Sequence, residues 1–282
     1  MDSYAYYNGK FGKRGDISIP LSDRSVFFGD AIYEAAIGCY DRIMWEEEHI
    51  DRLLVNARKL SIHHRYTKKD LSAILHEAAV KSCIDDYLIY FSLSRSSESR
   101  VHSALKCENA NLLITIEPFE VYCSSTPVTL TVKEDLRYQY CDIKTVNLLP
   151  NVTALTNAEK NGFDEVVFHR DGIVTECAKS NISIIKQGRL ITHPLTNHIL
   201  PGITRHHILE VCKRLGTPFS EGKYTLCDMY SADEIIISSS SKLCRKVRQI
   251  DGISVGGRNE KLADKICSTI FEEYENCIKN SN

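Results

Sequence analysis

One lysine of this chain lies in a setting where its amine could do chemistry. The segment from Arg137 to Leu149 reads RYQYCDIKTVNLL and becomes apolar around Lys144, with Ile143 before it and Val146 and two leucines after it. Such a lysine either snorkels to solvent along its apolar stem or holds its amine in a pocket. An amine in a pocket loses hydration, so its pKa falls and the neutral, nucleophilic form becomes accessible. That is the chemistry of a Schiff-base lysine, and this segment alone leaves both interpretations open.

Two further blocks follow the lysine at short spacing. The first, Val174–Asn181, reads VTECAKSN and comes after a turn at Asp171-Gly172. The second, Leu200–Arg205, reads LPGITR and opens a helical pattern. Backbone N–H groups at the start of a helix can bind a phosphate, and Gly202 would let the backbone approach it.

A lysine, a Thr-Glu-x4-Asn block and Gly-Ile-Thr-Arg in this order resemble the fold-type IV pyridoxal 5'-phosphate (PLP) enzymes. That family includes D-amino-acid aminotransferases, branched-chain aminotransferases and aminodeoxychorismate lyases. The resemblance extends from Asn8-Gly9 to about Gly252, and Cys141–Leu149 is most similar to the D-amino-acid (D-alanine) aminotransferases. It implies an α/β (α+β) fold of two domains, a smaller N-terminal α/β domain and a larger PLP-binding domain with a barrel-like sheet.

The resemblance also implies a set of cofactor residues. Lys144 would bond the cofactor and later move protons at the substrate α-carbon, and Glu176 would lie opposite the ring nitrogen and keep it protonated. The phosphate and the ring would be held by Arg52, Leu200, Gly202, Ile203, Thr204 and Ser240. Simpler roles stay open for some of these: Arg52 has the spacing of a surface ion pair with Glu48, and Leu200 suits an ordinary core position.

Substrate recognition is implied by a polar loop. Arg100 and His102 match an Arg-x-His pair that, in the D-amino-acid aminotransferases, reaches the active site of the partner subunit of a homodimer. Together with a tyrosine that Tyr33 matches, the pair would bind the substrate α-carboxylate, for which an arginine fork is suited. Without the other matches, these residues would be interpreted as a solvated loop.

Two positions depart from the family pattern. After the glutamate the chain has Cys177-Ala178-Lys179 where the family often has small serine- and glycine-rich sequences, and Lys242 follows the serine run where an acidic residue is usual. Cys177-Ala178 is also similar to aminodeoxychorismate lyases. The added positive charge leaves the substrate side chain open and points toward acidic substrates.

We therefore expect a PLP-dependent transaminase that moves amino groups between D-amino acids, such as D-alanine, D-glutamate and D-aspartate, and 2-oxo acids by a ping-pong mechanism. Aminodeoxychorismate lyase, branched-chain L-amino-acid aminotransferase and a non-catalytic PLP-binding protein remain alternatives. The preferred donor and acceptor are not determined by the sequence.

The amino-acid composition limits the ligands and partners that the chain is expected to have. The 282 residues carry a net charge of −2, so no nucleic acid is expected, and no apolar run is long enough to span a membrane. Eleven dispersed cysteines and no signal peptide indicate free thiols in the cytoplasm. Ten histidines without cysteines at ligand spacing predict no metal site.

The pattern of elements predicts two domains, 1–117 and 128–282, joined by a linker at 118–127. Short strands are expected at Tyr4–Asn8 and Ile17–Pro20 on either side of a tight turn at Asn8-Gly9, and a buried strand at Ala31–Tyr40. Helical spacing covers Glu46–Ile62 and a second helix capped by Thr67. In the second domain, helices are expected at 151–161, 204–215 and 262–278, with strands at 128–132, 165–169, 182–185, 189–192 and 232–239.

Overall fold

The computed structural model describes residues 3–121 and 126–279 of the chain. They form two compact units. The first comprises the described residues up to Val121, the short segment Ile143–Asn147 and residues 276–279, and the second comprises residues 126–142 and 148–275. Four residues of the expected linker, 122–125, lie outside the described residues.

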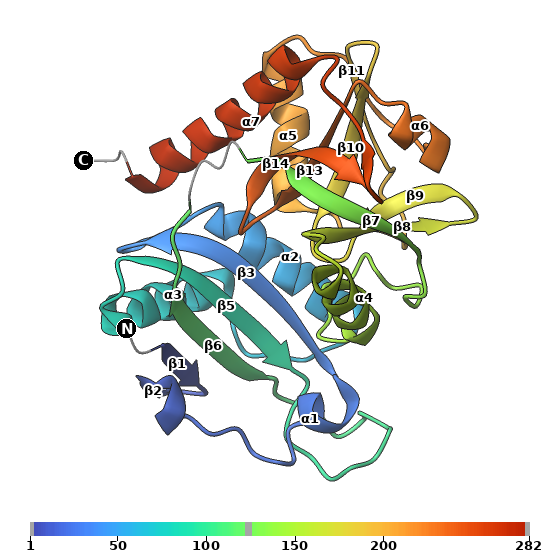
Figure 1. Cartoon of the computed structure of the whole chain (residues 1–282). Coiled ribbons are helices and arrows are strands. Elements are labelled where there is room, and N and C mark those ends of the chain that lie inside the picture. The colour runs from blue at the N-terminus through green and yellow to red at the C-terminus, as the bar shows by residue number, and fades with distance from the viewer. Residues whose placement is uncertain (1–2, 122–125, 280–282) are drawn as a thin grey trace. The chain divides into compact units, whose positions relative to one another are not determined.

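The first unit is built on an antiparallel sheet of six strands in the order β2-β1-β6-β5-β3-β4 (Figure 1). Its long central strands β3, β5 and β6 are paired over most of their length. Two helices, α2 and α3, pack on this sheet and share one apolar core with it. The elements are β1 (Tyr4–Tyr7), β2 (Lys10–Lys13), α1 (Arg24–Phe28), β3 (Ala31–Cys39), β4 (Arg42–Ile43), α2 (Glu46–Lys59), α3 (Lys68–Ser82), β5 (Asp86–Ser94) and β6 (Asn111–Pro118).

Strand β5 shows why the sheet has one buried face. Tyr87, Ile89, Phe91 and Leu93 are completely buried and belong to the core with the helices. Successive side chains of a strand point to opposite faces, so this alternation places one face against α2 and α3. Helix α3 begins at a capping box, in which Thr67 and the residue three positions on satisfy each other's backbone N–H groups, as expected.

The second unit contains a mixed sheet of nine strands, ordered β12-β11-β10-β13-β14-β7-β8-β9 with β15 beside β14. The sheet is strongly curled into a half-barrel. Helices α5 and α7 pack on β13 and β14, and α4 packs on β7 and β8 (Figure 1). The strands are β7 (Val128–Glu134), β8 (Glu165–Arg170), β9 (Ile173–Cys177), β10 (Asn181–Lys186), β11 (Arg189–Thr192), β12 (Phe219–Glu221), β13 (Glu234–Ser239), β14 (Leu243–Ile250) and β15 (Ile253–Ser254). The helices are α4 (Leu149–Lys160), α5 (Ile203–Arg214), α6 (Leu226–Tyr230) and α7 (Glu260–Tyr274).

Strand β13 is central to this sheet. Its three consecutive isoleucines, Ile235 to Ile237, are all buried. A strand with apolar residues on both faces is covered on both sides, and here helices cover one face and the curl of the sheet encloses the other. The prediction of a buried strand at this position is confirmed.

The segment Ile143–Asn147 belongs to the first unit, although the residues before and after it in the sequence belong to the second unit. Its backbone pairs with the start of β3: the Tyr33 amide donates to the Lys144 carbonyl oxygen at 2.9 Å, and Thr145 forms a bridge with Ile32. Ile143 belongs to the core of the first unit. An apolar residue and two backbone contacts thus hold Lys144 beside β3.

One expected strand is wrong. The stretch Ile17–Pro20 has no regular structure, and the hairpin partner of β1 is β2, which starts directly after the turn at Asn8-Gly9. Both turn residues have positive φ (45° and 99°), the geometry of a two-residue hairpin, so the returning strand begins at once. Among the described residues, no helix is both long and apolar enough to span a membrane.

Candidate functional site

Lys144 lies against an aromatic ring in the first unit. Its Nζ is 4.3 Å from the centre of the Tyr33 ring, which stacks in turn on Tyr90 of the neighbouring strand with ring centres 5.2 Å apart. Lys144 is half-buried. The structure therefore brings together two residues that the sequence predicted for one site, and the amine is held over a ring face.

Arg52 belongs to a buried cluster with Glu34 and His49. Its Nε and Nη2 atoms each donate to one oxygen of Glu34 at 2.7 Å, and His49 Nδ1 lies 2.7 Å from Glu34 Oε2. Burial by itself would raise the pKa of Glu34, but the Arg52 charge and the bonds from Arg52 and His49 outweigh it and lower the pKa to about 2. Burial lowers the pKa of His49, against the effect of Glu34. Glu34 on β3 thus fixes the plane of the Arg52 guanidinium.

The loop with Arg100 and His102 is anchored by its backbone. Arg24, 4% exposed, donates from Nη1 to the Val101 carbonyl oxygen at 2.7 Å and from Nη2 to that of His102 at 3.2 Å. The side chains of Arg100 and His102 are exposed and lie near Phe28 of α1, at 5.7 and 5.3 Å from its ring centre. Within one chain, these hydrogen bonds hold the backbone of the loop, and both side chains lie at the surface.

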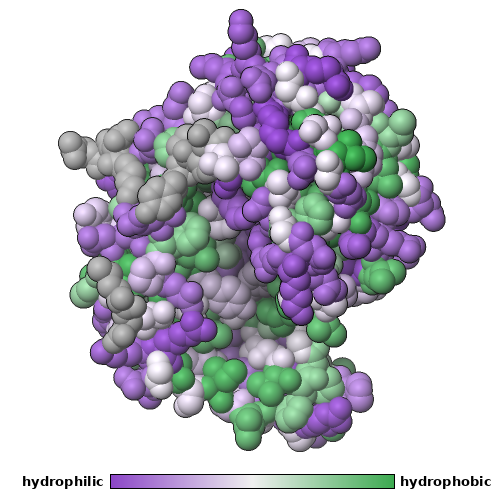
Figure 2. All heavy atoms as spheres, viewed as in Figure 1, coloured by the Kyte–Doolittle hydropathy of each residue, from purple (hydrophilic) through white to green (hydrophobic). Residues whose placement is uncertain are grey.

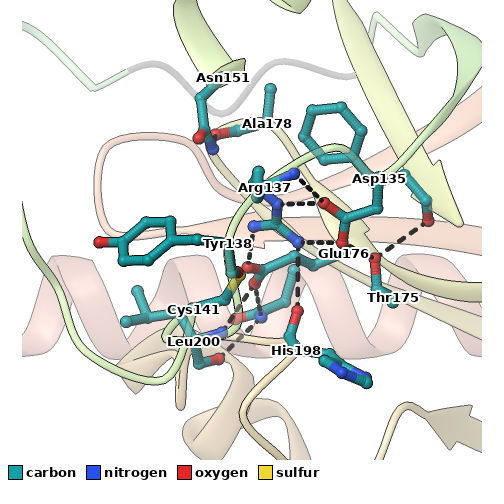
Figure 3. Close-up of polar contacts among 12 residues, drawn as sticks. Asp135, Arg137, Tyr138, Cys141, Asn151, Thr175, Glu176, Ala178, His198 and Leu200 are labelled. Carbon is teal, nitrogen blue, oxygen red and sulfur yellow. Dashed lines mark hydrogen bonds and ion pairs between the residues drawn. The ribbon is translucent and has the colours of Figure 1, made fainter. Parts of the chain in front are cut away.

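Glu176, at the end of β9, is the centre of a buried polar network in the second unit (Figure 3). Its Oε1 accepts from Arg137 Nη1 at 2.5 Å, and its Oε2 accepts from Asn181 Nδ2 at 2.9 Å and from the Leu200 amide at 3.0 Å. Burial raises the pKa of Glu176, and Arg137 and these bonds oppose the shift. Although Glu176 lies near the end of a strand, its side chain is buried and not exposed to solvent.

A cup of backbone groups forms at the start of α5. Gly202 is the N-cap of this twelve-residue helix, and a Cβ at Gly202 would come within 1.9 Å of the Asn181 Oδ1 atom. Only glycine fits there. Thr204 is 1% exposed, and its hydroxyl is buried without a hydrogen-bond partner in the described structure. The amides of the first helical turn also lack intrahelical acceptors, so this end of α5 can bind an anion.

Ser240 follows β13 in the second unit. The strands β10 and β13 pair so that Asn181 lies opposite Ser238, two residues before Ser240. Ser240 is half-buried in the turn that leads to β14. The pairing therefore brings the serine run to the end of β10 at which Asn181 contacts Glu176 and Leu200.

Sequence reasoning missed several residues that shape these groups. Glu34, Asp135 and Arg137 were not assigned roles, although Arg137 opens the lysine segment. Arg52 lies 18 residues from Glu34, and Glu176 lies 39 residues from Arg137, so spacing along the chain carries no signal for these two contacts. Asn181 ends the Thr-Glu-x4-Asn block, and that match was the available signal.

Comparisons with known proteins show the family and the fold of the chain. The family model "Amino-transferase class IV" matches residues 33–250. The chain is 35% identical over 274 residues to a D-alanine aminotransferase of Listeria monocytogenes, with 94% of each chain covered. Two solved structures share the fold: the branched-chain amino acid aminotransferase of Escherichia coli (TM-score 0.89, 22% identity, 100% and 97% of the chains covered) and a putative 4-amino-4-deoxychorismate lyase of Legionella pneumophila (TM-score 0.84, 24% identity, 92% and 97% covered).

The residues present fit PLP, the cofactor of this family. PLP carries a phosphate dianion, and the start of α5 offers amides and an unpartnered Thr204 hydroxyl. PLP also carries a ring nitrogen that needs an anionic partner, and Glu176 is a buried carboxylate held by three donors. The chain therefore belongs to the class IV aminotransferases, PLP-dependent enzymes that act on amino acids and 2-oxo acids.

Proposed function

We propose that this enzyme transfers amino groups between D-amino acids and 2-oxo acids. The observation that carries the proposal is the similarity to D-alanine aminotransferases over 94% of the chain. It is supported by the anchored loop of Arg100 and His102, since an arginine fork held at a surface suits a carboxylate.

We assign the work of the reaction to the chain's own side chains. Bound PLP supplies a sink for the electron pair left when the substrate α-carbon loses its proton. Lys144 holds the cofactor covalently and moves that proton, Glu176 keeps the ring nitrogen protonated, and Arg52 binds the phosphate. The remaining phosphate and ring contacts are assigned to Leu200, Gly202, Ile203, Thr204 and Ser240.

We further propose a homodimer in which the loop of one chain completes the substrate site of the other. Large exposed apolar side chains concentrate on α1 and the loops beside it: Ile19, Leu21, Val26, Phe27, Val101 and Leu105. Figure 2 shows hydrophobic residues gathered at this end of the first unit, where Figure 1 places α1. An apolar surface of this kind is typical of an interface. In this arrangement, Arg100 and His102 of one chain and Tyr33 of the other hold the substrate α-carboxylate.

We place the enzyme in the cytoplasm. All ten described cysteines are free thiols, as expected in a reducing compartment.

The substrate proposal is tested by single half-reactions. The holoenzyme is mixed with D-alanine, D-glutamate, D-aspartate, L-alanine or L-leucine, and the 2-oxo acid formed is measured in the absence of an acceptor. We expect stoichiometric product with the D-amino acids and none with the L-amino acids. Product from L-leucine alone would identify a branched-chain aminotransferase, and pyruvate release from aminodeoxychorismate without an acceptor would identify the lyase.

The role of Lys144 is tested separately by borohydride reduction, which makes a lysine–PLP bond permanent, followed by peptide mapping. We expect the label on the peptide that contains Lys144. The variant Lys144→Ala should still bind PLP through its phosphate but should carry no label and lose turnover by many orders of magnitude. Lys179, an exposed lysine in the Glu176 block, serves as the control, and Lys179→Ala should keep the label. Label on any other lysine contradicts the assignment.

A further inference from the structure

Glu176 belongs to a cluster of four charged side chains, of which Figure 3 shows Glu176, Arg137 and Asp135. Arg137 lies between two carboxylates: Nη1 donates to Glu176, while Nε and Nη2 donate to the two oxygens of Asp135, both at 2.9 Å. Arg170 donates from Nε to Asp135 Oδ2 at 3.1 Å and from Nη2 to the Arg137 carbonyl oxygen at 2.9 Å. Two guanidinium groups therefore face two carboxylates.

The Arg137 side chain is held in one orientation. It is 8% exposed, its guanidinium carbon lies 4.9 Å from the centre of the Phe168 ring, and Nη2 also donates to the His198 carbonyl oxygen at 3.1 Å. Its fork is thus occupied on both edges and its face is covered. A residue fixed in this way fixes the carboxylate that it contacts.

The protonation state of Glu176 depends on this arrangement. A completely buried carboxylate without a cation takes up a proton, because burial penalises the charged form. Burial raises the pKa of Glu176, and Arg137 is the first of the groups that oppose the shift. Arg137 is shared between Glu176 and Asp135, and Arg170 also pairs with Asp135, so two positive charges balance two negative ones. Arg137 therefore opposes the protonation of Glu176 as part of this cluster.

We propose that Arg137 is a positioning residue for the reaction: it keeps Glu176 ionised and oriented, so that the proton shared with the cofactor's ring nitrogen stays on the nitrogen. This inference rests on the proposed function, in particular on the role given to Glu176. In a site without water, a carboxylate and a pyridine nitrogen favour the neutral pair, with the proton on the carboxylate. Arg137 contacts the Glu176 carboxylate directly. Its charge therefore lowers the proton affinity of Glu176 more than that of the ring nitrogen, which would lie on the far side of the carboxylate.

The experiment uses holoenzyme loaded with PLP labelled with ¹⁵N in its ring, and the ¹⁵N chemical shift reports whether the nitrogen is protonated. At neutral pH, we expect a protonated nitrogen in the wild type, an unprotonated one in Arg137→Gln, and recovery of the protonated signal in Arg137→Lys. Glutamine keeps an aliphatic stem and an amide donor but lacks the charge. The half-reaction with D-alanine should slow by about 100-fold in Arg137→Gln.

Arg170→Gln is the matched control, because Arg170 shares Asp135 but donates to a backbone carbonyl rather than to Glu176. It should keep the protonated signal. A double-variant cycle gives a further readout. When Glu176 is already glutamine, adding Arg137→Gln should slow the half-reaction by less than about threefold, because the carboxylate charge on which Arg137 acts is gone.

Retention of the protonated signal in Arg137→Gln overturns the proposal. An unprotonated nitrogen in the wild type overturns it too, and that measurement does not depend on the folding of any variant. Equal rate losses from Arg137→Gln in both backgrounds also overturn it, since they indicate a merely structural role. Failure of the proposed function is distinguishable, because then the wild type either binds no PLP or reacts with no D-amino acid.

Discussion

Arg52 and Glu34 form a two-bond ion pair between residues 18 positions apart in the sequence. The sequence left open whether Arg52 binds a phosphate or pairs with Glu48 on the helix surface. The structure shows Arg52 bound to a completely buried carboxylate, with its side chain 10% exposed. A buried, oriented guanidinium suits phosphate binding, because its geometry is set before the ligand arrives.

The Glu34 pKa makes a prediction about stability. Its folded-state pKa of about 2 lies below the ordinary value of 4.5, so the contribution of Glu34 is complete above about pH 4.5 and is lost as the pH falls through 2. Each pKa unit corresponds to about 1.4 kcal/mol, so this contribution is on the order of 3 kcal/mol. Urea unfolding at several pH values should show that Glu34→Gln is destabilised at pH 7 and that its difference from wild type shrinks below pH 4.

The matched control is Glu77→Gln, which removes an exposed carboxylate paired with Lys81 on α3. An exposed helical pair contributes only a few tenths of a kcal/mol, so this variant should unfold close to the wild type at every pH. A pH-independent difference for Glu34→Gln would show that packing, and not the ion pair, explains the loss.

At the scale of elements, the start of α5 is positioned by the block that ends in Asn181. The Asn181 amide donates to Glu176 and to the Leu200 carbonyl oxygen, while its oxygen lies where a Cβ of residue 202 would be. One side chain thus links the carboxylate of β9 to the N-cap of the helix. The family's Glu-x4-Asn and Gly-Ile-Thr motifs are two sides of a single contact.

This contact predicts the effect of Gly202→Ala. The new methyl group should displace Asn181, which loosens both Glu176 and the start of α5. PLP binding should therefore weaken by about 1–3 kcal/mol, equivalent to roughly a 5- to 150-fold loss of affinity. Fluorescence titration of the apoenzyme with PLP measures it. Gly222→Ala is the control, because a Cβ there has nothing within 4 Å and its backbone carries no positive φ. Equal affinities for the two variants would contradict a phosphate cup at α5.

At the scale of the whole molecule, the proposed dimer makes each active site depend on two chains. Arg24, which holds the loop of Arg100 and His102, also donates to Asp30. Arg95 donates to Asp30 as well, and to the carbonyl oxygens of the two residues that follow α2, Leu60 and Ser61. The loop is therefore ordered in each chain by itself. Because the Arg100 and His102 side chains are exposed, they suit contact with a substrate bound to the partner chain better than packing in the core of their own chain.

Mixing two inactive variants tests this dependence. In a mixed dimer of Arg100→Ala and Lys144→Ala chains, one site carries both changes and the other carries neither, so activity should return. Random exchange gives about half mixed dimers, so we expect up to a quarter of wild-type activity. Arg100→Ala alone should weaken D-alanine binding by about 2–4 kcal/mol and leave PLP binding unchanged. Proven mixed dimers without activity would show that the loop serves its own chain.

The sequence by itself determined the family and most of the elements. The capped helix α3, the strand that precedes the turn at Asp171-Gly172 and the buried β13 follow from local periodicity and turn chemistry, which act within a few residues. The segment around Lys144 was recognisable because its apolar neighbours and its distance from the Thr-Glu block are both features of the linear chain. The false strand at Ile17–Pro20 shows the limit, since strand pairing depends on where the turn places the partner.

Only the tertiary structure decided how the charged residues are paired. Arg137, which follows β7, contacts Glu176 because β7 and β9 lie on either side of β8, and Glu34 contacts Arg52 because α2 packs on β3. Such contacts join residues with no fixed separation along the chain, and they matter because burial makes an unpaired charge costly. The spacing of motifs could identify Glu176, whereas the group that keeps it ionised became visible only once the sheet had formed.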